Sequence, residues 1–547
     1  MLHKLSVIFG EEMKMDLAIK DLEEQVKCRR TFAIISHPDA GKTTLTERLL
    51  LFGGAIRLAG SIKGRKTKKY AASDWMEMER QRGISITSSV LQFSYNGYQV
   101  NLLDTPGHQD FSEDTYRTLA AADSALMLID MAKGVETQTV KLFEVCRMQG
   151  IPIFTFINKL DHHGREPLEL LDEIEKVLGI GSYPLNWPAG LGFGSYGLYD
   201  RHYQRLLLSA KGQQTKIISA SSGGIKDMAI QNALDSYSYK KLRAEIELLE
   251  GAGEDFEPEK VNRGQLTPVF FGSALSGFGV EPFFREFLSL APPPSEKKSS
   301  AGLIDPATPR FSGFIFKIQA NMNPAHRDRI AFLRVCSGEF KRDKMVIHAR
   351  TGKKVRLSQP QQFLAQNRNI VEEAYPGDII GLFDPGLYQI GDTLVEDGSF
   401  SFDSLPRFSP ELFAKVTARD TMKYKQFHKG LSQLSEEGAV QLYWVPGTEE
   451  IILGVVGELQ FEVFQYRLQE EYGVKINLRR LSYQLARWVK DPEPELLHSL
   501  RGFVVRDERG ETVVLFENEF YLDLALKRNP NAALYTLEEY SNLEKER

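Results

Sequence analysis

The feature that most constrains the fold is an apolar run that stops at a short loop and continues into a helix-forming stretch, TFAIISHPDAGKTTLTERLL, at 31–50. The loop from Ser36 to Thr43 has the spacing of a phosphate-binding loop, with Ser36 where the strict pattern has Gly. Such a loop needs a strand before it and a helix after it, because backbone amides and a helix N-terminus must surround phosphate oxygens. The stretch therefore belongs in an α/β domain.

Each position of this loop has a predicted task. Lys42 would reach the β- and γ-phosphates of a nucleotide, and the Thr43 hydroxyl would ligate Mg²⁺. The other members of the predicted phosphate site are His37, Pro38, Asp39, Ala40, Gly41 and Thr44.

Apolar runs alternate with helical stretches from Thr31 to about Pro292. Runs that are apolar at nearly every position suit parallel strands buried on both faces, so we expect a doubly wound α/β domain. A chain of 547 residues is too long for a single core. We expect a helical extension at 1–30, the P-loop domain at 31–292 with an insertion at about 165–265, a linker at 293–310, a β-barrel at 311–405 and a ferredoxin-like α+β domain at 406–547.

The two later domains are predicted from pattern. Short alternating runs separated by turn signals such as YPGD favour the barrel. The order strand, helix, strands, helix, strand from Pro410 favours the α+β domain, whose second helix is predicted at 458–473 and ends at Gly473.

Composition excludes several classes of protein. A net charge of −5 gives no overall attraction to nucleic acid, and the three cysteines have no metal or redox spacing. The chain has neither a signal-peptide core nor an apolar run of about 18 residues, so we expect a cytoplasmic protein with no membrane contact, and a monomer.

A second motif, VNLLDTPGHQDF, follows another predicted strand. Asp104 would hold Mg²⁺ through water, and the Gly107 amide would close on a γ-phosphate. His108 stands where GTPases keep the residue that orients the attacking water, and Thr105 and Pro106 complete the segment. The alternative is that Asp104 caps a helix and His108 is a surface loop residue, but a phosphate loop already requires a second carboxylate for Mg²⁺.

A third motif, FINKLD, indicates which base is bound. The Asp161 carboxylate can accept hydrogen bonds from N1 and the 2-amino group of guanine, a discrimination against adenine of about 10⁴. Lys159 would lie over the base, Asn158 would brace the loop beside Leu160, and the amides of Ser273 and Ala274 in FFGSAL would meet the guanine O6. The three motifs in this order predict GTP.

The segment between the first two motifs resembles a known switch. RGISI, DTPGH and NKLD resemble the motifs of the translational GTPases, the elongation factor G/Tu-like family. DWMEMERQRGISIT, FKIQANMNPAHRDRIAFLRV, VEEAYPGDIIGL and LSEEGAVQ are similar to the bacterial release factor 3 branch of that family. The resemblance covers about 29–489 and thins at 180–235 and after 490.

This resemblance implies a ribosome-stimulated GTPase that removes class I peptide chain release factors from the ribosome after peptide release. It implies that Ser85 or Thr87 senses Mg²⁺ and that His108 is catalytic, with Ile84 and Pro38 as an apolar gate. We expect the basic residues at 57–69 to face RNA; a solvated basic loop is the alternative. Gln109 stands where the family usually has Glu.

Three other functions are less consistent with the sequence. A translocase of the elongation type needs more chain after the α+β domain than about 60 residues. A GTP-sensing ribosome-binding protein with incidental hydrolysis is disfavoured by His108. A small-molecule kinase is disfavoured by NKLD, and we expect the adjacent His162 and His163 to be exposed residues rather than metal ligands.

Overall fold

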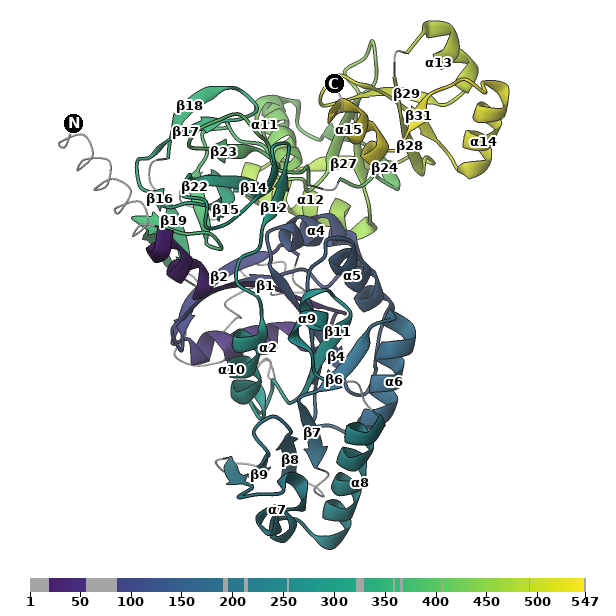
Figure 1. Ribbon diagram of the computed structural model, residues 1–547. Coiled ribbons are helices and arrows are strands. Elements are labelled where there is room, and N and C mark those ends of the chain that lie inside the picture. Colours follow the sequence, from purple (N-terminus) through teal and green to yellow (C-terminus); the bar gives the residue numbers. More distant parts are fainter. Residues whose placement is uncertain are drawn as a thin grey trace, which may run out of the picture.

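Seven strands form the central sheet of the first domain in the computed structural model, in the order β2–β3–β1–β4–β5–β11–β6 (Figure 1). All neighbours are parallel except β2 and β3, which pair antiparallel. The strands are β1 (Arg29–Ser36), β2 (Ser89–Tyr95), β3 (Tyr98–Asp104), β4 (Ser124–Asp130), β5 (Ile153–Asn158), β6 (Gly181–Pro184) and β11 (Leu266–Phe271). The structure describes residues 19–55, 86–189, 195–210, 215–252, 255–320, 329–357, 360–364, 367–405, 407–490 and 492–545.

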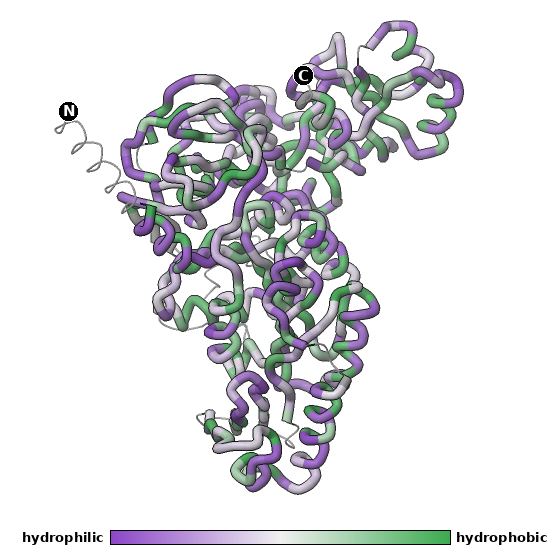
Figure 2. The backbone as a smooth tube through the Cα atoms, viewed as in Figure 1, coloured by the Kyte–Doolittle hydropathy of each residue, from purple (hydrophilic) through white to green (hydrophobic). Residues whose placement is uncertain are grey.

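Helices cover both faces of this sheet. One face packs against α2 (Lys42–Phe52) and α10 (Val280–Leu290), and the other against α4 (Ser112–Ala120), α5 (Thr137–Met148) and α6 (Pro167–Leu178). The outer helices alternate between hydrophilic and hydrophobic residues, as helices with one buried face do (Figure 2). The predicted doubly wound α/β domain is confirmed. Among the described residues, no helix has the length and apolar character needed to cross a membrane.

A smaller antiparallel sheet lies at the end of this domain remote from the other domains (Figure 1). It consists of β7 (Asn186–Ala189), β8 (Ser195–Asp200), β9 (Arg205–Ala210) and β10 (Lys216–Ser219), followed by α7 (Met228–Ala233), α8 (Ser236–Ala252) and α9 (Pro258–Asn262). The preceding strand β6, which falls within the stretch assigned to the insertion, pairs with β11 in the central sheet.

The second domain is an antiparallel barrel of eight strands with an additional short pair. The barrel strands are β14 (Ser312–Ala320), β15 (Arg329–Ser337), β17 (Met345–His348), β18 (Lys353–Arg356), β19 (Gln361–Leu364), β20 (Asn367–Ile370), β22 (Ile379–Phe383) and β23 (Thr393–Val395). The short pair is β16 (Phe340–Lys341) and β21 (Glu373–Ala374). The stretch expected to be a linker forms a hairpin of β12 (Lys297–Ser299) and β13 (Gly302–Ile304), because SSAG supplies a tight turn between its strands.

The third domain begins with the predicted ferredoxin-like unit. Its strands lie in the order β27–β24–β26–β25, and α11 and α12 pack on them. These elements are β24 (Leu412–Ala418), α11 (Tyr424–Glu436), β25 (Gln441–Trp444), β26 (Ile451–Val455), α12 (Glu458–Tyr472) and β27 (Ile476–Arg480).

The same sheet continues into a region that the sequence pattern did not resolve. Strand β29 pairs with β25, and β30, β28 and β31 follow. The added elements are β28 (Leu485–Val489), α13 (Pro494–Leu500), β29 (Phe503–Asp507), β30 (Thr512–Phe516), α14 (Glu519–Arg528), β31 (Leu534–Tyr535) and α15 (Leu537–Lys545).

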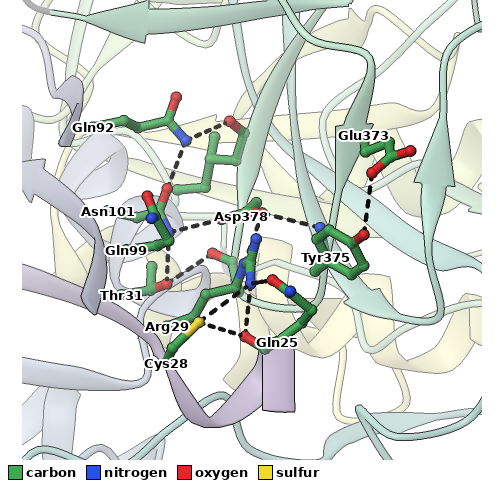
Figure 3. Close-up of polar contacts among 12 residues, drawn as sticks. Gln25, Cys28, Arg29, Thr31, Gln92, Gln99, Asn101, Glu373, Tyr375 and Asp378 are labelled. Carbon is green, nitrogen blue, oxygen red and sulfur yellow. Dashed lines mark hydrogen bonds and ion pairs between the residues drawn. The ribbon is translucent and has the colours of Figure 1, made fainter. Parts of the chain in front are cut away.

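The first strand of the α/β domain is fastened to the barrel by polar contacts (Figure 3). Arg29 Nε donates to Asp378 Oδ2 at 2.8 Å, and the guanidinium lies 4.6 Å from the Tyr375 ring centroid. Thr31 Oγ1 donates to the Gly377 carbonyl at 2.7 Å. These contacts lie at the start of β1, whose other end leads into the phosphate loop, so one strand connects the barrel interface to that loop.

A buried ion pair reinforces this interface. Arg334 Nη2 of β15 lies 2.5 Å from Asp123 Oδ2, and both side chains are at most 1% exposed. Lys297 Nζ, at the start of the hairpin, lies 3.7 Å from the other Asp123 oxygen. One carboxylate thus neutralises cations from two segments of the chain.

Replacing Asp123→Ala leaves Arg334 buried without its carboxylate, so we expect a loss of about 3–5 kcal/mol in the free energy of unfolding. Asp172→Ala serves as the control, because its partner Lys176 is 73% exposed and such pairs contribute about 1 kcal/mol or less. Urea denaturation followed by circular dichroism measures both. Equal midpoints for the two variants would contradict the importance of the buried pair.

Candidate guanine-nucleotide site

The phosphate loop connects β1 to α2 and has two residues in the left-handed region, Asp39 (φ 67°) and Gly41 (φ 98°). A Cβ on Gly41 would collide with the Asn158 side chain, so glycine is required there for both space and backbone conformation. Helix α2 begins directly after the loop, and the amides of a helix N-terminus are available to an anion. The buried Ser36 hydroxyl has no hydrogen-bond partner among the described residues.

The end of β3 brings an acid beside this loop. Lys42 Nζ lies 2.5 Å from Asp104 Oδ1, and the two side chains are 8% and 1% exposed. Strands β1 and β3 are parallel neighbours, so their carboxyl ends place the two predicted residues together. Thr43 follows Lys42 in the first turn of α2 and is partly buried. A lysine, a hydroxyl and a carboxylate are thus available to phosphate and Mg²⁺.

The segment after Asp104 lies against the phosphate loop. Thr105 Oγ1 donates to the Ile34 carbonyl at 2.6 Å, and a Cβ on Gly107 would lie 3.4 Å from the Pro38 nitrogen. The segment ends in a short 3-10 helix, η1 (Gln109–Phe111), with His108 at its N-cap. The His108 side chain is 36% exposed and its Nδ1 accepts from the Asp110 amide at 3.3 Å.

Asn158, at the end of β5, joins two predicted loops. Its Nδ2 donates to the Ala40 carbonyl at 2.9 Å, and its Oδ1 accepts from the Ala274 amide at 2.8 Å. The Leu160 amide donates to the Gly272 carbonyl at 3.1 Å, which adds a backbone contact. Phosphate loop and base loops therefore form one connected structure.

Asp161 and Ser273 are also brought together, because Ser273 Oγ donates to Asp161 Oδ1 at 2.5 Å. The second carboxylate oxygen lies 3.5 Å from His162 Nε2. The Ser273 amide donates to the Phe278 carbonyl at 3.0 Å, and the Ala274 amide donates to Asn158 Oδ1. Contact of these two amides with guanine O6 remains a prediction.

Sequence reasoning missed Asp130, which ends β4. Lys159, at φ 69°, places Nζ 2.7 Å from Asp130 Oδ2 and 2.7 Å from the Asp39 carbonyl. Burial alone would raise the pKa of Asp130, but the hydrogen bond and charge of Lys159 and the Ala132 amide outweigh it and hold the pKa below its ordinary value. The sequence signal for Asp130 was the stretch MLID, in which an acid ends an apolar strand, as Asp104 ends its own strand.

The structure describes some of the other predicted switch residues and not others. Ser85, Ile84 and the basic residues at 57–69 lie outside the described residues. Thr87 is described and partly buried, and the neighbouring Ser88 is tied by its amide and hydroxyl to Asp114 Oδ2, each at 2.7 Å. Among the described residues, no group of three or more His, Cys, Asp or Glu side chains could hold a metal ion. This holds also for the region around His162 and His163.

A phosphate loop, a DxxG segment and an NKxD loop at the carboxyl ends of three parallel strands of one sheet, β1, β3 and β5, define a P-loop GTPase. Comparison with family models agrees. Residues 27–293 match the elongation factor Tu GTP binding domain, 310–397 match elongation factor G domain 2, and 402–526 match the class II release factor RF3 C-terminal domain.

Relatives align over nearly the whole chain. A peptide chain release factor 3 of Symbiobacterium thermophilum is 57% identical over 515 residues, 93% of this chain and 97% of the relative. A peptide chain release factor 3 of Listeria monocytogenes serotype 4a is 55% identical over 523 residues, which cover 95% of this chain and 99% of the relative. A crystal structure of a Thermus thermophilus protein shares the fold with a TM-score of 0.68 at 23% identity, covering 86% of this chain and 71% of that one.

The chain belongs to the peptide chain release factor 3 family. It is a translation-termination GTPase, and its first domain binds guanine nucleotide.

Replacing Asp161→Asn removes the acceptor for two guanine donors while keeping the shape of the side chain. We expect GTP affinity to fall by about 100-fold or more and xanthosine triphosphate to bind better than in the original protein. Nucleotide titration by fluorescence measures both. Asp172→Asn, an exposed change on α6, is the control, and an unchanged GTP affinity in Asp161→Asn would reject the assigned role.

Proposed function

We propose that this protein uses GTP binding and hydrolysis to promote dissociation of class I peptide chain release factors from the ribosome after peptide release. The observation that carries the proposal is that one chain combines a GTP binding domain with a third domain that matches the class II release factor RF3 C-terminal domain. We further propose that it acts as a cytoplasmic monomer, and that ribosomal RNA and proteins and a class I release factor are its partners.

In this proposal the phosphate loop holds the nucleotide, and Lys42 leaves Asp104 to pair with the β- and γ-phosphates. Thr43 and Asp104 would hold Mg²⁺, with Ser85 or Thr87 as a further ligand on the switch segment. A bound Mg²⁺ would neutralise charge on the phosphate oxygens. The buried Ser36 hydroxyl, which has no hydrogen-bond partner among the described residues, supports a phosphate at this loop.

Hydrolysis in this proposal depends on His108. The side chain stands at the edge of the loop and is turned toward Asp110, which lies 3.2 Å away. We infer that ribosomal RNA draws His108 toward the γ-phosphate, where it orients the attacking water. Positioning and charge stabilisation then matter more than removal of a proton. Loss of the γ-phosphate would release the switch segment that ends near Thr87.

We expect His108→Ala to bind GTP normally and to lose ribosome-stimulated hydrolysis by about 100-fold or more, the usual contribution of a positioned catalytic side chain. Single-turnover phosphate release with and without ribosomes measures this. His498→Ala, at an exposed position of α13 in the third domain, is the matched control. Near-normal turnover in His108→Ala would remove this residue from the mechanism.

The termination step itself is tested with ribosomes halted at a stop codon and carrying a labelled class I release factor. We expect GTP and this protein together to accelerate departure of the label. Stimulated GTP hydrolysis without faster departure would contradict the proposed step and point to another stage of translation.

A further inference from the structure

Helix α12 of the third domain begins without a capping side chain of its own, because its N-cap residue is Gly457. Gln460 Oε1 accepts from the amides of Val456 and Gly457 at 2.8 and 3.1 Å. The Leu459 amide lies in the first turn of the helix, where amides have no acceptor within the helix. Asp110 of the GTPase domain provides one, with Oδ2 2.7 Å from the Leu459 nitrogen.

The same carboxylate also faces the proposed catalytic histidine. Asp110 Oδ1 lies 3.2 Å from His108 Nδ1, and the Asp110 side chain is 9% exposed. The Asp110 amide donates to the same ring nitrogen at 3.3 Å. The ring nitrogen makes one of these two bonds at a time: without a proton it accepts from the Asp110 amide, and with a proton it donates to Asp110 Oδ1. In either case Asp110 joins α12 to the Nδ1 side of His108.

The backbone of Gly457 makes this contact possible. A Cβ on Gly457 would collide with the Asp110 carboxylate. Its φ of −142° is extended backbone that any residue adopts, so space alone requires glycine here. Beside this contact, Phe111 packs with Ile86 and Val463 in a small apolar cluster. The three residues come from the histidine segment, the end of the switch segment and α12.

We infer that Asp110 is a positioning residue for GTP hydrolysis, through which the placement of α12 in the third domain sets the orientation of His108. The helix N-terminus carries a partial positive charge that stabilises the Asp110 carboxylate. A shift of α12 relative to the GTPase domain moves this carboxylate, and the ring that it holds moves with it. The inference rests on the proposed catalytic role of His108.

The test uses Gly457→Ala, which displaces Asp110 without altering any residue of the nucleotide site. We expect ribosome-stimulated hydrolysis in a single turnover to change by about tenfold or more, since a misplacement of about 1 Å can cost 100-fold. GTP affinity without ribosomes should be unchanged. Gly251→Ala is the matched control, because a Cβ there meets nothing within 4 Å.

A double-variant cycle distinguishes positioning from a structural role. If Asp110 acts through His108, Gly457→Ala has little further effect on the residual rate of His108→Ala. Equal effects in both backgrounds, or an unchanged rate in Gly457→Ala alone, would overturn the inference. Asp110→Asn, which can keep the bond to Leu459 but changes the group facing His108, should alter the rate even if Gly457→Ala folds poorly. Normal turnover in His108→Ala would instead reject the proposed function.

Discussion

The contacts of residues 86–117 with the barrel and the third domain fix the position of both domains relative to the nucleotide site. Lys317 Nζ of β14 donates to the Ser88 carbonyl at 2.6 Å and lies 3.3 Å from Asp114. Burial alone would raise the pKa of Asp114, but the charge of Lys317 and the hydrogen bonds of Ser88 hold it below its ordinary value. The barrel is therefore fastened to the chain directly after the switch segment, at Ser88, and to α4 at Asp114.

The third domain is fastened to the same segment by buried groups. Arg117 pairs with Glu113 inside α4 and lies against Gly438, where a side chain would have no room. The close packing of the Arg117 guanidinium against Gly438 therefore favours one arrangement of the two domains. A nucleotide-dependent change in residues 86–117 must then move whole domains or break such contacts. This coupling is what a GTPase needs if it is to do work on the ribosome.

Much of this architecture was predictable because its signals are local. The motifs containing Lys42, Asp104 and Asp161 each follow an apolar strand, and parallel strands bring such ends to one edge. The pair of Arg334 with Asp123 and the capping of α12 by Asp110 were not predictable, because they join residues more than 200 positions apart and leave no spacing in the sequence. Of the strands after residue 484, β29 pairs with β25 of the preceding unit, and no local signal in the sequence indicates that the sheet continues there.

We infer that the nucleotide state reaches the third domain through the contact of Asp110 with α12. Amide hydrogen exchange of Leu459 tests it most directly, with GDP and with a non-hydrolysable GTP analogue, and the buried Leu468 later in the same helix serves as an internal reference. We predict that protection of Leu459 differs between the two nucleotides by about fivefold or more, while that of Leu468 stays the same. Equal protection of Leu459 in both states would contradict the claim.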